Sequence, residues 1–178
     1  MTIGSEFLDQ SRKVFRSQKD LADKAIVQLT DADLLWQPDA ETNSIAINMK
    51  HIAGNMISRW TDFLTSDGEK PDRNRDGEFI VDENGIGGLH EYWERGYSVF
   101  FSMIDSLIEA DLLKTVMIRS EPHSVIQAIQ RQLSHYGYHI GQIVALAKQI
   151  KGSEWKTLSI PRGQSEEYLH GKFVPQKG

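Results

Sequence analysis

Apolar residues recur at intervals of three and four in four separate stretches of the chain. This spacing places them along one side of an α-helix, with charged residues on the other side. We therefore predict four amphipathic helices, at about 5–29, 44–66, 88–110 and 124–150. The second follows a connector containing Trp36 and Pro38.

The segment between the second and third helices differs sharply from its neighbours. Residues 65–88, TSDGEKPDRNRDGEFIVDENGIGG, are dense in Gly, Asp, Asn and charge, which predicts a long loop. Loops of this length in compact domains are often functional. At the start of the second helix, Asn43 or Ser44 can serve as the N-cap.

A second irregular segment precedes the fourth helix. In residues 112–122, LLKTVMIRSEP, apolar residues alternate with polar ones, which predicts a short extended link. Ser120 with Glu121, or Ser124, can then start the fourth helix.

Four amphipathic helices predict an all-α fold, and a four-helix bundle is its simplest arrangement. We expect one domain over residues 1–178, with the bundle at about 5–150 and a C-terminal tail at 151–178. The tail shows no clear periodicity, so we expect it to pack over the bundle in irregular form, with a short helix around 165–170. Its apolar residues are Trp155, Ile160, Pro161, Tyr168 and Phe173.

Composition and charge exclude several classes of function. The chain has 178 residues, of which 39% are hydrophobic and 25% charged, as in globular domains. No apolar run is long enough to cross a bilayer, and the first residues lack the pattern of a secretory signal, so we expect a cytoplasmic protein without membrane contact. The net charge of −5, with scattered basic residues, argues against nucleic-acid binding. The absence of cysteine excludes a cysteine nucleophile and thiolate metal ligands.

Two histidines in the fourth helix stand four residues apart. His135 and His139 therefore lie on the same side of the helix, one turn apart, and both imidazoles can bind one ion of zinc, nickel, iron or copper. The pair alone is weak support, because a chain with six histidines produces this spacing by chance. Exposed or core-flanking histidines are the alternative.

A third histidine strengthens the hypothesis of a metal site. His51 precedes a residue of the apolar stripe of the second helix, just as His135 and His139 do in the fourth. All three are rotated by about 100° from their stripes. Three neutral nitrogen ligands leave one position open for water or substrate, as in catalytic metal sites. The remaining histidines are explained as surface residues: His90, His123 and His170.

The neighbours of these histidines limit the chemistry. In HExxH zinc proteases the residue after the first histidine is the general base, whereas Tyr136 holds that place here, which disfavours peptide hydrolysis. Asn55 and Gln142 each lie about one turn from a histidine. They can orient the histidines or contact substrate, or they are buried amides that join helices.

The pattern of a histidine in the second helix, a long crossover and HxxxHxGQI in the fourth resembles the DinB/YfiT-like metalloenzyme superfamily. The likeness covers nearly the whole chain and is closest to a DinB-like bacterial subfamily of unknown function. The segments that carry it are KHIAGNMISRWTDFLTSDGEK, RNRDGEF, AIQRQLSHYGYHIGQIVALAKQIKG and WKTLSIPRG.

The resemblance implies a four-helix bundle with up-down-down-up connectivity and a divalent metal, most often nickel or zinc, bound by His51, His135 and His139. Relatives in the superfamily are thiol-dependent: they join glutathione, mycothiol or bacillithiol to electrophiles, or isomerise maleylpyruvate, and many are homodimers. The superfamily name refers to induction by DNA damage, a stress response, which is not evidence for DNA binding.

The resemblance thus implies a thiol S-transferase whose metal activates a low-molecular-weight thiol for attack on an electrophile. Substrate contacts are then expected near the metal, from Arg59 and Tyr136 together with Asn55 and Gln142. Bacterial thiols carry carboxylates or hydroxyls, and four arginines are candidate clamps for them: Arg59, Arg73, Arg75 and Arg119.

Two other hypotheses remain open. A metal-dependent hydrolase would share the three histidines, but it requires a carboxylate or another base nearby, and Asp62 lies three turns from His51. Alternatively, the protein is a non-catalytic helical binding protein with a vestigial metal site, whose tail and long loop bind a partner.

Overall fold

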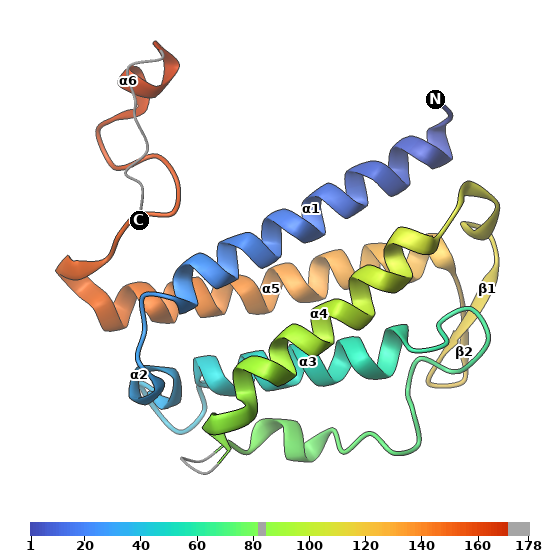
Figure 1. The fold of residues 1–178 in the computed structure, drawn as a ribbon, viewed down its shortest axis with the longest axis horizontal. Coiled ribbons are helices and arrows are strands. Elements are labelled where there is room, and N and C mark those ends of the chain that lie inside the picture. The colour runs from blue at the N-terminus through green and yellow to red at the C-terminus, as the bar shows by residue number, and fades with distance from the viewer. Residues whose placement is uncertain (82–84, 171–178) are drawn as a thin grey trace.

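The computed structural model describes residues 1–81 and 85–170 and is mostly helical (Figure 1). Its four long helices are α1 (Ile3–Ile26), α3 (Ile45–Trp60), α4 (Leu89–Ser106) and α5 (Val125–Lys151). Figure 1 shows that α1 and α5 run in one direction and α3 and α4 in the other. The shorter elements are α2 (Asp31–Leu35), α6 (Ser165–Leu169), the strands β1 (Thr115–Ile118) and β2 (Glu121–Ser124), and 3₁₀ turns at Asp76–Phe79, Ile86–Gly88, Glu109–Asp111 and Gly152–Glu154.

The long helices bury one continuous apolar core. Helix α3 packs against both α4 and α5, and α1 packs against α5. The rings of Phe15 on α1 and Phe100 on α4 meet edge to face at 4.6 Å, and Phe100 also contacts Tyr136 of α5. Gly96 lets α4 approach α3 closely, since a Cβ there would lie 2.7 Å from the Cα of Ala53. None of the helices in the described ranges combines the length and apolar character that a membrane span requires.

Helix starts follow the capping rule. Ser44 caps α3 by accepting a hydrogen bond from the N–H of Ile47, which confirms one of the two expected caps. Ser124 caps α5 in a reciprocal arrangement with Gln127. A start of the fourth helix at Ser120 with Glu121 is wrong, because these residues belong to the strand hairpin that precedes α5.

Two helices end earlier than the apolar periodicity predicts. Helix α3 stops at Trp60 instead of continuing to about residue 66, because Thr61 is extended and Asp62 has a positive φ of 49°. Phe63 is buried in the turn that follows α3, so its position in the sequence fits the apolar spacing of the helix although it is not helical. Helix α4 likewise stops at Ser106, before the expected end near residue 110.

The extended link is one strand of a hairpin. Strand β1 pairs with β2 in antiparallel register, and Arg119 and Ser120 form the turn with φ of 55° and 62°. Two positive φ values are characteristic of the tight turn that matches strand twist. Asp67 connects the long loop to this turn, because its carboxylate accepts hydrogen bonds from the N–H groups of Arg119 and Ser120 at 2.9 and 2.7 Å.

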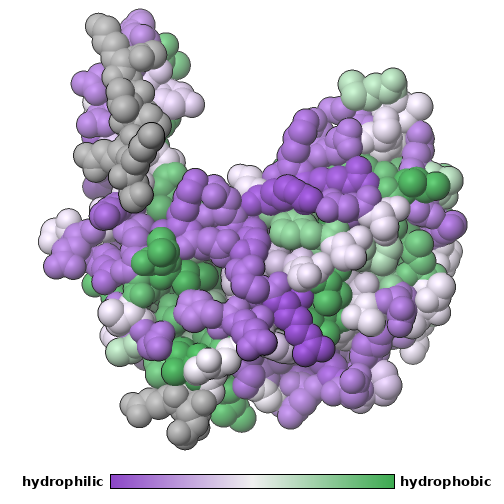
Figure 2. Space-filling view, viewed as in Figure 1, coloured by the Kyte–Doolittle hydropathy of each residue, from purple (hydrophilic) through white to green (hydrophobic). Residues whose placement is uncertain are grey.

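The tail departs from the core after its first residues. Trp155 and Leu158 pack against the helices, but α6 stands away from them in Figure 1, and Tyr168 is 53% exposed. The expected short helix at 165–170 is confirmed as α6, whereas packing over the helices is wrong for this part of the tail. Phe173 and residues 82–84 of the long loop lie outside the described residues. Figure 2 shows that hydrophilic and hydrophobic residues are interspersed on this face of the molecule, with hydrophilic ones more frequent.

Candidate metal centre

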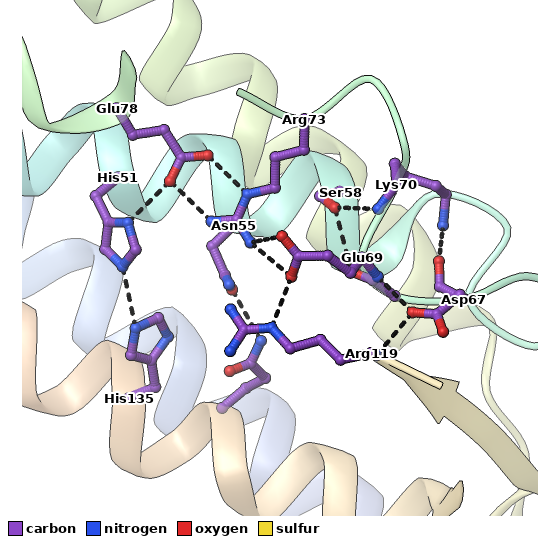
Figure 3. Close-up of polar contacts among 12 residues, drawn as sticks. His51, Asn55, Ser58, Asp67, Glu69, Lys70, Arg73, Glu78, Arg119 and His135 are labelled. Atoms are coloured by element: carbon purple, nitrogen blue, oxygen red, sulfur yellow. Dashed lines mark hydrogen bonds and ion pairs between the residues drawn. The ribbon is translucent and has the colours of Figure 1, made fainter. Parts of the chain in front are cut away.

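Three histidines converge between α3 and α5. His51 extends from α3, and His135 and His139 extend from successive turns of α5. Each offers one nitrogen, and these nitrogens all lie within 4.8 Å of one another. The Nε2 atoms of His51 and His135 are 3.2 Å apart (Figure 3). The sequence spacing therefore predicted a cluster that the fold brings together.

Hydrogen bonds fix the orientation of two of the rings. Nδ1 of His51 donates to Oε2 of Glu78 at 2.9 Å, and Nδ1 of His139 donates to Oδ1 of Asn48 at 2.8 Å, because a carboxylate and an amide oxygen can only accept. When neutral, each of these two rings therefore carries its lone pair on Nε2. In many metal sites the ligand histidines are held in this way by an oxygen on the opposite ring nitrogen.

Glu78 is held in place from several sides. It belongs to the 3₁₀ turn Asp76–Phe79, which packs on α3. Arg73 forms a fork with it, from Nε to Oε1 at 2.7 Å and from Nη2 to Oε2 at 2.8 Å. The carboxylate fits against Gly54 of α3, where a Cβ would lie 2.8 Å from its Cδ. Burial raises the pKa of Glu78, but hydrogen bonds from His51 and Arg73 outweigh this and lower it, so the group is a carboxylate.

His135 and His139 are neutral at physiological pH. Burial lowers the pKa of His135 to about 3, and the neighbouring His139 and His51 act in the same direction. Burial and His51 lower the pKa of His139 to about 4, while a hydrogen bond with Gln142 acts in the opposite direction. Neutral imidazoles are the form that binds metal ions.

The donor set fits a divalent late first-row metal. Zn–N bonds of about 2.0–2.1 Å in a tetrahedral site place neighbouring nitrogens roughly 3.3 Å apart, and the Nε2 atoms of His51 and His135 are 3.2 Å apart. Imidazoles also suit nickel, copper and iron. His51, His135 and His139 are the residues that would hold the ion.

Asn55, one helical turn after His51, and Tyr136, which follows His135, belong to a buried polar cluster. The amide oxygen of Asn55 accepts hydrogen bonds from Gln132 at 2.8 Å and from the Tyr136 hydroxyl at 3.1 Å. Trp60 in turn donates to the same hydroxyl at 3.0 Å. Burial raises the pKa of Tyr136, so it stays protonated. These contacts join α3 to α5, which is the role of buried amides that the sequence left open.

The four candidate arginines occupy different environments. Arg73 is paired with Glu78 and Glu69. Arg119 is half exposed and forms an ion pair with Glu69 at 3.2 Å, and Arg75 is exposed. Arg59 is only 2% exposed. Its Nε and Nη1 are buried and have no hydrogen-bond acceptor among the described residues.

The other histidines take no part in the cluster. His90 is exposed at the start of α4. The ring of His123 contacts the carbonyl of Glu121 at 3.0 Å, and that of His170 lies 3.5 Å from Glu166 on α6. They fit the surface positions that the sequence predicted.

Two residues of the site escaped the sequence reasoning, Glu78 and Asn48. Asn48 had a recognisable signal, because it lies three residues before His51 and seven before Asn55, so these polar residues share one face of an otherwise apolar helix. Glu78 had none, since no periodicity fixes the path of a long loop.

This fold and site define a mostly helical protein with a three-histidine candidate metal centre. Residues 2–164 match the family described as "Protein of unknown function (DUF1572)", and the chain belongs to this family. No curated protein and no solved structure matches the chain.

Proposed function

We propose that the protein is a metal-dependent enzyme that holds one divalent ion, nickel or zinc, with His51, His135 and His139. The observation that carries the proposal is the convergence of three imidazoles whose nitrogens lie within 4.8 Å of one another. Three protein ligands leave room for a further ligand, as in catalytic metal sites. The DinB/YfiT-like resemblance of the sequence points to the same residues.

Neighbouring residues orient the histidines for metal binding. Glu78 and Asn48 hold two of the rings with Nε2 free, and Arg73 keeps Glu78 ionised. A carboxylate on the far nitrogen also makes an imidazole a better donor. Burial excludes water from His51 and His139, which are 5% and 7% exposed.

The reaction that we propose is thiol S-transfer. A bound divalent ion would act as a Lewis acid and would lower the pKa of a thiol, so that the thiolate is present at neutral pH. The thiolate sulfur forms a bond to the electrophilic carbon, the leaving group departs with the bonding electron pair, and the thiol proton passes to solvent. A chain without cysteine suits this chemistry, because the substrate brings its own sulfur.

The remaining expectations are part of the same proposal. The antiparallel pairing of α1 and α5 with α3 and α4 in Figure 1 supports an up-down-down-up four-helix bundle. We propose that residues 1–178 form one such domain, with the bundle at about 5–150 and the tail at 151–178, and that two copies associate as a cytoplasmic homodimer, as in relatives of the superfamily.

A hydrolase requires a general base, and the carboxylate that lies near the histidines is not available for this role. Glu78 is near the histidines, which the sequence did not predict. Its two oxygens are engaged by His51 and Arg73, on the side of the His51 ring opposite Nε2. A general base must reach the proton that it removes, and Glu78 is instead fixed as a support for His51.

Turnover with thiols tests the proposal. Nickel- or zinc-loaded protein is incubated with a chlorinated nitroarene and with glutathione, mycothiol or bacillithiol in turn, and the thioether product is measured. We expect thiol-dependent product from the wild type, none above background from His135→Ala, and wild-type rates from His90→Ala. Metal-loaded protein without thiol-dependent turnover with any of these thiols would contradict the transferase.

A further inference from the structure

A buried arginine without a counter-ion lies beside the three-histidine centre. Arg59 follows His51 and Asn55 at intervals of four residues, so the three side chains occupy one face of α3. Arg59 is 2% exposed, and no carboxylate among the described residues lies within ion-pair distance of it. A buried unpaired charge is strongly unfavourable in proteins, which makes this arrangement unusual for a purely structural residue.

The acids of this region are all engaged elsewhere. Glu78 is paired with Arg73, and Glu69 with both Arg73 and Arg119. Asp67 accepts three backbone N–H groups, from Glu69, Arg119 and Ser120. Figure 3 shows Glu78 next to His51, with Arg73, Glu69 and Arg119 further along this network. Arg59 therefore has no ion-pair partner among these acids, although the charges of Glu69 and Asp67 act on it from a distance.

Arg59 lies on the same helix as His51, and the loop that follows α3 covers it from outside. The eight residues between His51 and Arg59 are about two helical turns, so Arg59 lies roughly 12 Å along α3 from His51. Gly68 covers Arg59 from outside, since a Cβ on that glycine would lie 2.7 Å from Cδ and 2.9 Å from Nε of Arg59. The residues on either side of Gly68, Asp67 and Glu69, line a depression of about 640 Å³ together with Arg75, Arg119 and Ser120.

We propose that Arg59 binds the carboxylate of an acidic substrate that reacts at the three-histidine centre. This inference rests on the proposed metal-dependent function and adds the substrate class. One unpaired guanidinium matches one negative charge, and its planar donors match the geometry of a carboxylate. A phosphate dianion would require further cations, and Arg73 and Arg119 are already paired.

The ion pair between Glu69 and Arg119 at the surface can open to admit such a substrate. Glu69 and Arg119 are 25% and 50% exposed at their side chains, and exposed pairs contribute little stability, so they separate easily. Arg75 and Arg119 line the depression beside Asp67 and Glu69, and separation of the Glu69–Arg119 pair would expose the Arg119 guanidinium to an approaching acid.

The test uses two probes of the same shape, 3-mercaptopropionate and its neutral amide 3-mercaptopropionamide. In metal-free protein at constant ionic strength, we expect the acid to raise the thermal unfolding midpoint and the amide to leave it unchanged, because only the acid binds Arg59 in the folded state. Arg59→Gln should abolish this difference, and Arg16→Gln, on the surface of α1, should keep it. Arg59→Met provides a second variant, and circular dichroism establishes that each is folded.

The cobalt-loaded protein gives a second readout. Thiolate binding to cobalt produces a charge-transfer absorption, from which we expect the acid to bind about tenfold more tightly than the amide, as a charge-assisted hydrogen bond predicts. Arg59→Gln should reduce this ratio to about one without weakening the amide. No preference for the acid in the metal-free wild type, or an undiminished preference in Arg59→Gln, overturns the carboxylate site. An intact preference in metal-free protein with no cobalt absorption from either thiol upholds the site and contradicts the thiol chemistry instead.

Discussion

Glu78 accepts the Nδ1 proton of His51 at 2.9 Å, although the two residues are separated by 27 positions and belong to different elements. The contact connects the long loop after α3 to the candidate metal centre. It depends on Arg73, which holds both oxygens of Glu78, and on Gly54, which leaves space for the carboxylate. The loop therefore contributes to the centre without supplying a ligand.

Glu78→Gln should weaken metal binding while keeping the shape of the side chain. The substitution removes the negative charge that orients His51 and raises its basicity, and losses of this kind reduce metal affinity by about 10- to 100-fold. Competition with a chromophoric chelator measures the dissociation constant. Glu69→Gln is the matched control, since Glu69 contacts Arg73 but not His51. Equal affinities in wild type and Glu78→Gln would show that the contact has no influence on the metal.

Gly54→Ala and Gly141→Ala should shift stability in opposite directions. A methyl group at position 54 meets the buried carboxylate of Glu78, so we expect a loss of about 1–3 kcal/mol in the free energy of unfolding. A methyl group at position 141 meets nothing within 4 Å, so the better helix propensity of alanine should stabilise α5 by up to about 1 kcal/mol. Urea denaturation of the metal-free proteins measures both. Stabilisation by Gly54→Ala would contradict the tight fit around Glu78.

Asp67→Asn should destabilise the protein at neutral pH and lose its effect in acid. The N–H of Glu69 most strongly, with those of Ser120 and Arg119, lowers the pKa of Asp67 below its ordinary 3.8. A lowered folded-state pKa gives stability that is complete above the unfolded value and disappears as the pH falls through the folded value. We expect a difference of about 1–2 kcal/mol between wild type and variant above pH 5. It should shrink below pH 3.8, as denaturation at several pH values will show, and a constant difference would exclude this linkage.

Arg59→Met should stabilise the ligand-free protein. Methionine fills a similar volume and removes a buried charge that has no counter-ion, a change that stabilises proteins by about 1–4 kcal/mol in comparable cases. Chemical denaturation measures the gain, with Arg119→Met as the exposed control, for which we expect less than about 0.5 kcal/mol. Destabilisation by Arg59→Met alone would indicate that the arginine serves the fold and not a ligand.

The sequence predicted those parts of the site that lie on regular helices. His51, His135 and His139 are placed by helical periodicity, and their common offset from the apolar stripes already implied convergence. The approximate positions of the four helices were predictable for the same reason. Helix ends were less so: Phe63 keeps the apolar spacing after α3 has ended, because a buried turn can satisfy the same pattern.

The contacts that depend on the loop could not be predicted. Glu78 reaches His51 through a path of the chain that only tertiary packing determines, and the pairing of β1 with β2 depends on two positive φ values at Arg119 and Ser120, residues that seldom adopt them. The burial of Arg59 was equally hidden, because an arginine at the end of a helix is normally exposed.

Metal stoichiometry tests the central claim most directly. Metal-free protein is titrated with nickel or zinc at neutral pH, and bound metal per chain is determined by elemental analysis after gel filtration. We predict one ion per chain in the wild type and in His90→Ala, and little or none in His51→Ala, His135→Ala and His139→Ala that remain folded by circular dichroism. Full stoichiometry in His51→Ala would contradict a centre formed by the three histidines.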